Sequence, residues 1–328
     1  MRSLGKWLGR VLLALLVLAA AAWLILPGEP VDTDIGFGTA LSADRLDTYF
    51  AEAEARFDDI TPGVEKRVIW AGTPGARTGV SVVYIHGFSA TSEEIRPVPD
   101  LVARALGANL VYTRLSGHGR DGAALAEPAA GDWLEDVAEA LAAARAAGDR
   151  TLVIATSTGG TLAALAAMHP DLSASIDAIA FVSPNFAIAN ALSAILTWPG
   201  ARWWVPLAAG TERAWQPLND DHRRYWTTRY PTVALLPMMA LVKHVAKQDP
   251  GRATVPAMFL FSDADAVVSA AATRDVADRW GGEVALAPQK LPPGNDPYNH
   301  VIGGDVLSPG MTESVAKQIA GWARSLGL

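Results

Sequence analysis

Cysteine is absent from the 328-residue sequence, and basic residues form no tract beyond the N-terminus. The missing thiols exclude disulfide bonds, thiolate zinc sites and a cysteine nucleophile, and they leave the redox compartment undetermined. The net charge of -7, together with the lack of a basic tract, argues against a nucleic acid partner. No internal repeat is found, so we do not expect a repeat architecture.

The first 28 residues combine a basic flank with an apolar run. Three basic residues precede the run 11–26, which carries no charge, and acidic residues follow it. Two interpretations fit: a signal peptide cleaved within residues 19–22, or an uncleaved membrane anchor. We favour the anchor, because cleavage there would leave the apolar residues 23–26 at a mature N-terminus. In both cases the basic flank predicts that the rest of the chain lies outside the cytoplasm, on the periplasmic side.

Beyond residue 60, strand-like and helix-like segments alternate, and 50% hydrophobic content is ample for a core. This alternation predicts an α/β fold with a mostly parallel central sheet and helices on both faces. The expected strands are 65–70, 80–85, 109–115, 152–155, 178–182, 257–261 and 283–287. An amphipathic helix over 42–60 precedes them, and the other expected helices are 93–106, 132–147, 161–168, 270–280 and 312–326.

The alternation is interrupted over residues 185–250, which hold five of the eleven tryptophans. The segment is too apolar for a linker and too irregular for the sheet, so we expect it to fold back over another part of the molecule. The predicted organisation is a segment 1–28, a core formed by 29–184 and 251–328, and the insertion 185–250.

The stretch Thr151–Met168 reads as a strand, a tight turn and a helix, with Ser157 on the turn. It resembles the GxSxG nucleophile elbow, in which the serine occupies a strained turn at the top of a central strand. Ala155 stands in place of the first glycine, which is the smallest possible departure. The alternative is that Ser157 only caps the following helix, since serine is a favoured N-cap residue.

A serine nucleophile requires a base and an acid that orients the base. In the α/β-hydrolase arrangement the three residues follow one another in the order Ser, Asp, His, on loops after later strands. Of the six histidines, His300 alone has this order, and it lies in a loop rich in Pro, Gly and Asn that could present its ring. The acid should follow the strand 257–261, where both Asp263 and Asp265 are candidates.

These motifs resemble the α/β-hydrolase superfamily, in particular bacterial carboxylesterases and monoacylglycerol lipase-like proteins of the serine aminopeptidase-like group. The resemblance rests on five motifs: His86-Gly87-Phe88, Ser116-Gly117-His118-Gly119, the elbow at Ser157, the run 262–268 and Asn299-His300-Val301.

The resemblance implies roles for particular residues. The family pattern GxxDxxV falls on Ser262, Asp265 and Val268, which makes Asp265 the implied acid, and Ser262 replaces glycine by another small residue. The backbone amides of Phe88 and Thr158 are the implied oxyanion-hole donors. His118 is implied to be scaffold, and the insertion 185–250 matches the family's cap, whose apolar side chains would line an acyl or alcohol pocket.

We therefore expect a serine hydrolase that cleaves carboxylic esters, lipid-like esters among them. Ser157 would attack the carbonyl, His300 would accept and return the proton, and Asp265 would orient His300, with no metal or organic cofactor. One alternative is an amidase or peptidase with the same triad, and another is a hydrolase-like binding protein without catalysis. The sequence leaves the oligomeric state open.

Overall fold

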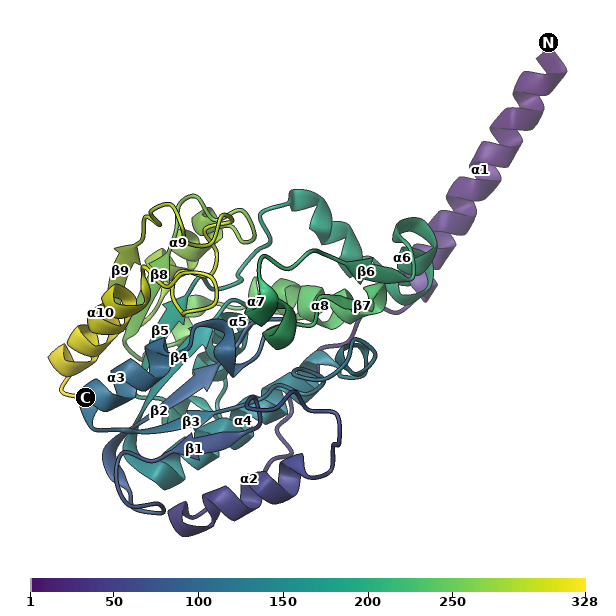
Figure 1. Cartoon of the computed structure of the whole chain (residues 1–328). Helices are drawn as coiled ribbons and strands as arrows, with labels where there is room; N and C mark the ends of the chain where they lie inside the picture. The colour runs from purple at the N-terminus through teal and green to yellow at the C-terminus, as the bar shows by residue number, and fades with distance from the viewer. Residues whose placement is uncertain (1) are drawn as a thin grey trace.

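The computed structural model describes residues 2–328, with the side chains of residues 6–14 and 23–328. The first element, α1 (Arg2–Ile25), projects away from the rest of the chain (Figure 1). Within the part of the chain that the structure describes, no helix meets the length and hydropathy needed to cross a membrane. Met1 and the side chains of residues 2–5 and 15–22 lie outside the described residues, so the anchor expected over residues 1–28 stays a prediction.

A seven-stranded sheet forms the centre of the molecule, in the order β1-β3-β2-β4-β5-β8-β9. All neighbouring pairs are parallel except β1 with β3, which confirms the predicted α/β fold with a mostly parallel sheet. The strands are β1 (Arg67–Ile69), β2 (Thr78–Ile85), β3 (Asn109–Tyr112), β4 (Gly148–Thr156), β5 (Ala178–Val182), β8 (Ala257–Phe261) and β9 (Val284–Pro288).

Helices cover both faces of this sheet (Figure 1). One apolar cluster holds side chains of α3 (Val98–Leu106) and α10 (Thr312–Ser325). The opposite cluster holds those of α4 (Ala130–Ala147), α5 (Thr158–Met168) and α9 (Ala270–Arg279). Burial on both faces explains why β5 and β8 are continuous apolar runs rather than alternating ones.

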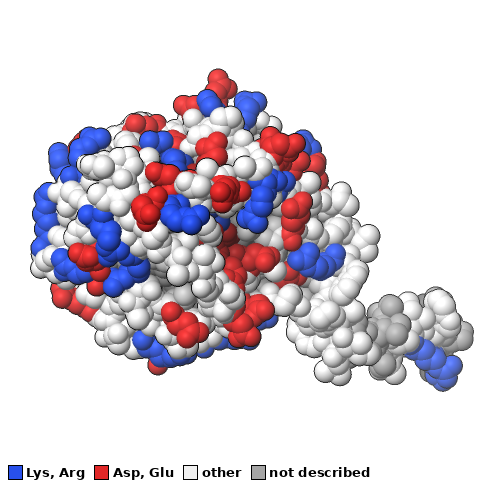
Figure 2. All heavy atoms as spheres, turned by 90° about the horizontal axis from the view of Figure 1, so that it is seen from below, with Lys and Arg blue, Asp and Glu red and all other residues white. Residues whose placement is uncertain are grey.

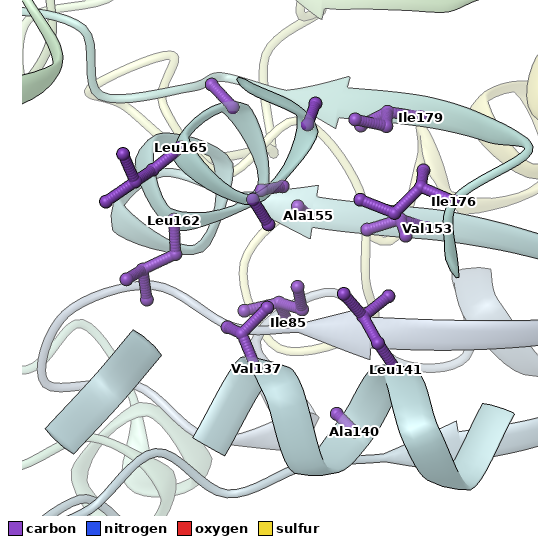
Figure 3. Close-up of a cluster of buried hydrophobic side chains, with 14 of the residues drawn as sticks. Ile85, Val137, Ala140, Leu141, Val153, Ala155, Leu162, Leu165, Ile176 and Ile179 are labelled. Atoms are coloured by element: carbon purple, nitrogen blue, oxygen red, sulfur yellow. The ribbon is translucent and has the colours of Figure 1, made fainter. Parts of the chain in front are cut away.

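Figure 3 shows how the second cluster fixes α4 and α5 against the sheet. Val137 and Leu141 of α4 point toward Ile85 and Val153 of β2 and β4, while Leu162 extends from α5 into the same layer. All five side chains are at most 1% exposed. This packing holds the carboxyl ends of β2 and β4, where the candidate site residues lie, in a fixed relation to each other.

Several predicted boundaries were wrong. The helix expected over 42–60 is only α2 (Leu46–Glu54), preceded by a short 3-10 turn, and the carboxylate of Glu54 binds Arg114 at its end. The helix expected from residue 93 begins at Val98. Pro97 and Pro99 have no backbone N–H, so neither can donate the hydrogen bond that would extend the helix toward residue 93. β4 is longer than predicted, since it pairs with β2 from Gly148 onward.

Between β5 and β8 the chain leaves the sheet and forms a separate set of short elements. They are α6 (Ala201–Ala209), β6 (Glu212–Ala214), α7 (Asp220–Tyr225), β7 (Arg229–Pro231) and α8 (Leu235–Val245). Strands β6 and β7 pair only with each other. Tyr230 of β7 packs edge-on against Phe88, at a ring distance of 5.6 Å. The insertion therefore reaches the loop that follows β2.

Candidate active site

Ser157 lies on the sharp turn between β4 and α5. Its backbone has φ 51° and ψ -117°, a strained conformation for a residue with a side chain. The turn is held by two main-chain hydrogen bonds, from Ser157 N to Val182 O (3.1 Å) and from Asn185 N to Ser157 O (2.9 Å). The Ser157 side chain makes no capping hydrogen bond to α5. The geometry is therefore that of a nucleophile elbow rather than of a simple helix cap.

Gly159, two residues after the serine, allows α5 to approach the end of β2. A Cβ at this position would lie 2.3 Å from the carbonyl oxygen of Ile85 and 2.6 Å from that of His86. No side chain fits in that space, so the glycine is required by the close approach of two backbones. Ala155, the departure from the expected pattern, is fully buried at the end of β4.

His300 lies between Ser157 and Asp265. Its Nε2 is 3.1 Å from Oγ of Ser157, and its Nδ1 is 2.8 Å from Oδ2 of Asp265. The side chain of His300 is 10% exposed and that of Asp265 is 1% exposed. The structure thus brings a hydroxyl, an imidazole and a carboxylate together in the order that acyl transfer requires.

The two candidate acids have different surroundings. Asp265 faces His300, and its second oxygen, Oδ1, accepts the amides of Val267 (2.8 Å) and Val268 (2.9 Å). Asp263 points to the surface and pairs with Arg274 at 2.8 Å. Of the two candidates, Asp265 is the one that contacts His300.

Asp296 holds the loop that presents His300, and the sequence analysis missed it. Its buried carboxylate accepts the amides of His300 (3.0 Å), Val301 (2.8 Å) and Tyr298 (3.1 Å). An aspartate before a proline at the start of a histidine loop is a turn signal, and this signal could have identified it.

The electrostatic surroundings of His300 favour its protonated form. Burial of the ring opposes protonation, but the hydrogen bond to Asp265 and the negative charges of Asp265, Glu94 and Asp296 outweigh it. The pKa of His300 is therefore raised above its ordinary value. This is the direction expected of a base that must hold a proton while the nucleophile attacks.

The implied oxyanion donors are the amide of Phe88, in the loop that follows β2, and the amide of Thr158, the residue after the serine. Thr158 begins α5, so its N–H has no partner within that helix. The amide of Phe88 donates to no residue that the structure describes. Both donors are thus free to bind an oxygen that becomes negative.

His86 and His118 belong to the scaffold of these loops. Nε2 of His86 accepts the amide of Leu115 at 3.1 Å, and the ring of His86 lies 5.0 Å from that of His118. Burial lowers the pKa of His86 to about 4 and that of His118 well below its usual range, so both rings are neutral at neutral pH. Among the described residues, no His, Asp or Glu cluster suited to a metal ion is found.

A family model described as serine aminopeptidase, S33, matches residues 77–288. The chain belongs to this family of α/β-hydrolases. The assignment confirms the group that the sequence motifs predicted. The match to the serine aminopeptidase family begins just before β2 and ends with β9, so it includes Ser157 and Asp265, and His300 lies beyond it.

Individual relatives are consistent with the family. A thermostable monoacylglycerol lipase of Bacillus sp. (strain H-257) is 30% identical over 192 residues, which is 58% of this chain and 72% of that protein. A solved structure from work on the metagenome-derived lipolytic enzymes LipS and LipT has a TM-score of 0.66 at 20% identity, covering 81% of this chain and 99% of that one. A monoacylglycerol lipase of Paleococcus ferrophilus has a TM-score of 0.56 at 16% identity, covering 80% and 99%. The structural likenesses show the shared fold, and the family match with the 30% identical relative places this chain among hydrolases of the lipase and esterase type.

Proposed function

We propose that this protein hydrolyses carboxylic esters through an acyl-enzyme formed on Ser157. The observation that carries the proposal is the position of His300, within hydrogen-bond distance of both Ser157 Oγ and Asp265 Oδ2. Transfer of the serine proton to Nε2 would free Oγ to attack the ester carbonyl, and Asp265 would stabilise the imidazolium that forms.

Each later step uses the same groups. The oxygen of the tetrahedral intermediate would be bound by the amides of Phe88 and Thr158. Return of the proton from His300 to the leaving alkoxide releases the alcohol and leaves the acyl group on Ser157. Water, deprotonated by His300, then attacks the acyl carbon, and collapse of the second intermediate releases the acid and restores the serine.

We propose monoacylglycerol-type esters as the substrate class. The 30% identical relative is a monoacylglycerol lipase, and its match spans 72% of that protein. The apolar insertion supports the same class, because Tyr230 packs against Phe88 of the implied oxyanion loop and Leu235 packs against the same apolar cluster. An acyl chain would be accommodated by such surroundings.

The decisive experiment compares the wild-type protein with Ser157→Ala. The wild type should hydrolyse p-nitrophenyl esters and monoacylglycerols and should be labelled by a fluorophosphonate, whereas the variant should do neither while unfolding at a similar temperature. Turnover by a folded Ser157→Ala variant would refute the mechanism. Matching p-nitroanilides, tested in parallel, separate an esterase from an amidase with the same triad.

We also propose that the N-terminal segment anchors the protein to a membrane, with the catalytic region outside the cytoplasm. The basic groups that the structure describes on the protruding helix α1 lie toward its far end, and acidic and basic groups are interspersed on the body (Figure 2). The near end of α1 adjoins the insertion, since Trp23 packs against Trp198 at 5.4 Å and Gly200 N donates to Pro27 O at 2.9 Å. Trp203 and Leu207 of α6 are 57% and 88% exposed, which adds apolar surface beside the helix.

A further inference from the structure

A buried carboxyl group contacts the loop that carries Phe88. Glu94 ends the short 3-10 turn Ser92–Glu94 and is 3% exposed. It belongs neither to the triad nor to the expected oxyanion donors, and the sequence gives no reason for a buried acid at this position. A buried carboxyl group is costly unless hydrogen bonds compensate for its lost hydration.

The hydrogen bonds of Glu94 converge on one oxygen. Oε2 accepts the amide of Gly87 at 2.7 Å and the hydroxyl of Tyr84 at 3.0 Å. The Tyr84 oxygen lies 3.1 Å from Oγ1 of Thr156, at the end of β4. Because the tyrosine proton is donated to Glu94, the threonine hydroxyl donates to Tyr84. The result is a continuous chain from Gly87 through Glu94 and Tyr84 to Thr156.

The two ends of this chain are adjacent to the two oxyanion donors. Gly87 immediately precedes Phe88, and Thr156 stands two residues before Thr158. We propose that Glu94 is a positioning residue of the oxyanion hole, whose carboxylate fixes the amides of Phe88 and Thr158 relative to each other. This inference rests on the proposed serine mechanism.

The space around Gly87 supports the same role. A Cβ on this glycine would lie 2.6 Å from Oε1 of Glu94 and 3.0 Å from Cβ of Ser157. Gly87 is thus enclosed between the carboxyl group and the nucleophile. Glu94 therefore limits how far the oxyanion loop can move away from Ser157.

The negative charge of Glu94 also acts on His300, the proposed base. Burial raises the pKa of Glu94, while the Gly87 amide, His300 and the Tyr84 hydroxyl all act to lower it. Burial and the nearby carboxylate raise the pKa of Tyr84 well above its usual value, so its hydroxyl remains a donor. The acidic groups that act on His300 are Asp265, Glu94 and Asp296. Removing the charge of Glu94 should therefore lower the pKa of His300.

The test uses the full chain with Glu94→Ala, Glu94→Gln and Tyr84→Phe. Tyr84→Phe breaks the link to Thr156 by removing one oxygen atom, so it decides the question if Glu94→Ala does not fold. We expect each variant to lower kcat by about tenfold or more with a much smaller change in KM, because the hole acts on the transition state. Affinity for a boronic acid transition-state analogue should fall in parallel.

The pH dependence separates a positioning role from simple support of the fold. Glu94→Gln should shift the acid limb of the kcat/KM profile to lower pH, whereas Tyr84→Phe keeps the charge and should shift it less. Glu54→Gln is the matched control, since it alters another buried glutamate, which pairs with Arg114 and is not among the acidic groups that act on His300. It should lower the unfolding temperature while leaving the pH midpoint unchanged.

The outcomes distinguish failure of the positioning role of Glu94 from failure of the serine mechanism on which that role rests. If the wild type reacts with a fluorophosphonate at Ser157 but Glu94→Ala and Tyr84→Phe keep both kcat and boronate affinity within twofold, only the role of Glu94 is refuted. If the wild type neither reacts nor hydrolyses esters, the serine mechanism is wrong and the role of Glu94 is refuted with it.

Discussion

Asp265 binds His300 with one carboxylate oxygen and its own loop with the other. Oδ2 lies 2.8 Å from Nδ1 of His300, while Oδ1 accepts the amides of Val267 and Val268. The side chain therefore cannot rotate without losing hydrogen bonds at both oxygens. This arrangement fixes the tautomer of the imidazole, with the proton on Nδ1 and the lone pair of Nε2 directed at Ser157.

Replacing Asp265 by asparagine should lower kcat by roughly 10⁴-fold, as the equivalent change does in chymotrypsin-type triads. The amide nitrogen cannot accept the Nδ1 proton, so the imidazole would adopt the wrong tautomer. Asp263→Asn is the matched control, because it removes only a surface pair with Arg274. Steady-state kinetics on a p-nitrophenyl ester measures both. A large loss in Asp263→Asn with little change in Asp265→Asn would reverse the assignment.

The kcat/KM profile should rise with pH and have its midpoint above 6.5, the ordinary pKa of histidine. The reason is that only neutral His300 can accept the serine proton, and its pKa is raised. Asp296→Asn should move this midpoint to lower pH by removing one of the charges that raise it. A midpoint below 6.5 in the wild type would contradict the electrostatic description of the site.

The raised pKa of His300 also makes the free energy of unfolding depend on pH. A histidine whose pKa is higher in the folded than in the unfolded state stabilises the fold when protonated. That contribution is fully present below about pH 6.5 and is lost as the pH rises through the folded-state pKa. Denaturant unfolding of the wild type and His300→Gln across this range should therefore differ most on the acid side. An equal difference at all pH values would argue against the raised pKa.

Gly159→Ala should destabilise the protein by about 1–3 kcal/mol and reduce activity, because the added methyl group would collide with the carbonyl oxygens of Ile85 and His86. Gly321→Ala is the matched control, since its Cβ would meet nothing within 4 Å in helix α10. The control should be neutral or stabilising by up to about 1 kcal/mol. Urea unfolding curves measure both changes, and a neutral Gly159→Ala would show that α5 can move away from β2.

The full-length protein should fractionate with membranes and keep residues 1–26. A chain that begins at Pro27 retains the carbonyl that accepts Gly200 N and the ion pair of Glu29 with Arg202. It should therefore fold, remain in solution and hydrolyse short esters. N-terminal sequencing of the membrane fraction decides between the two interpretations, since a mature chain beginning near Trp23 would indicate a cleaved signal peptide.

The sequence by itself determined the fold class, the family and the order of the candidate site residues. These follow from local signals: the alternation of strand and helix patterns, the small residues around Ser157, and a histidine in a loop after the last strand. Such signals depend on neighbours within a few residues, so they are readable without knowledge of the fold.

Only the tertiary structure decided which residues meet. The contact between His300 and Ser157 spans 143 positions, and the contact between Tyr84 and Thr156 spans 72. The tertiary structure also distinguished Asp265 from Asp263 by position alone, whereas the sequence distinguished them only through a family resemblance. In addition, it revealed the buried carboxyl groups of Glu94 and Asp296. Hydrogen bonds between distant residues depend on strand order and register, because parallel strands bring their carboxyl ends to one edge of the sheet regardless of their separation in the chain.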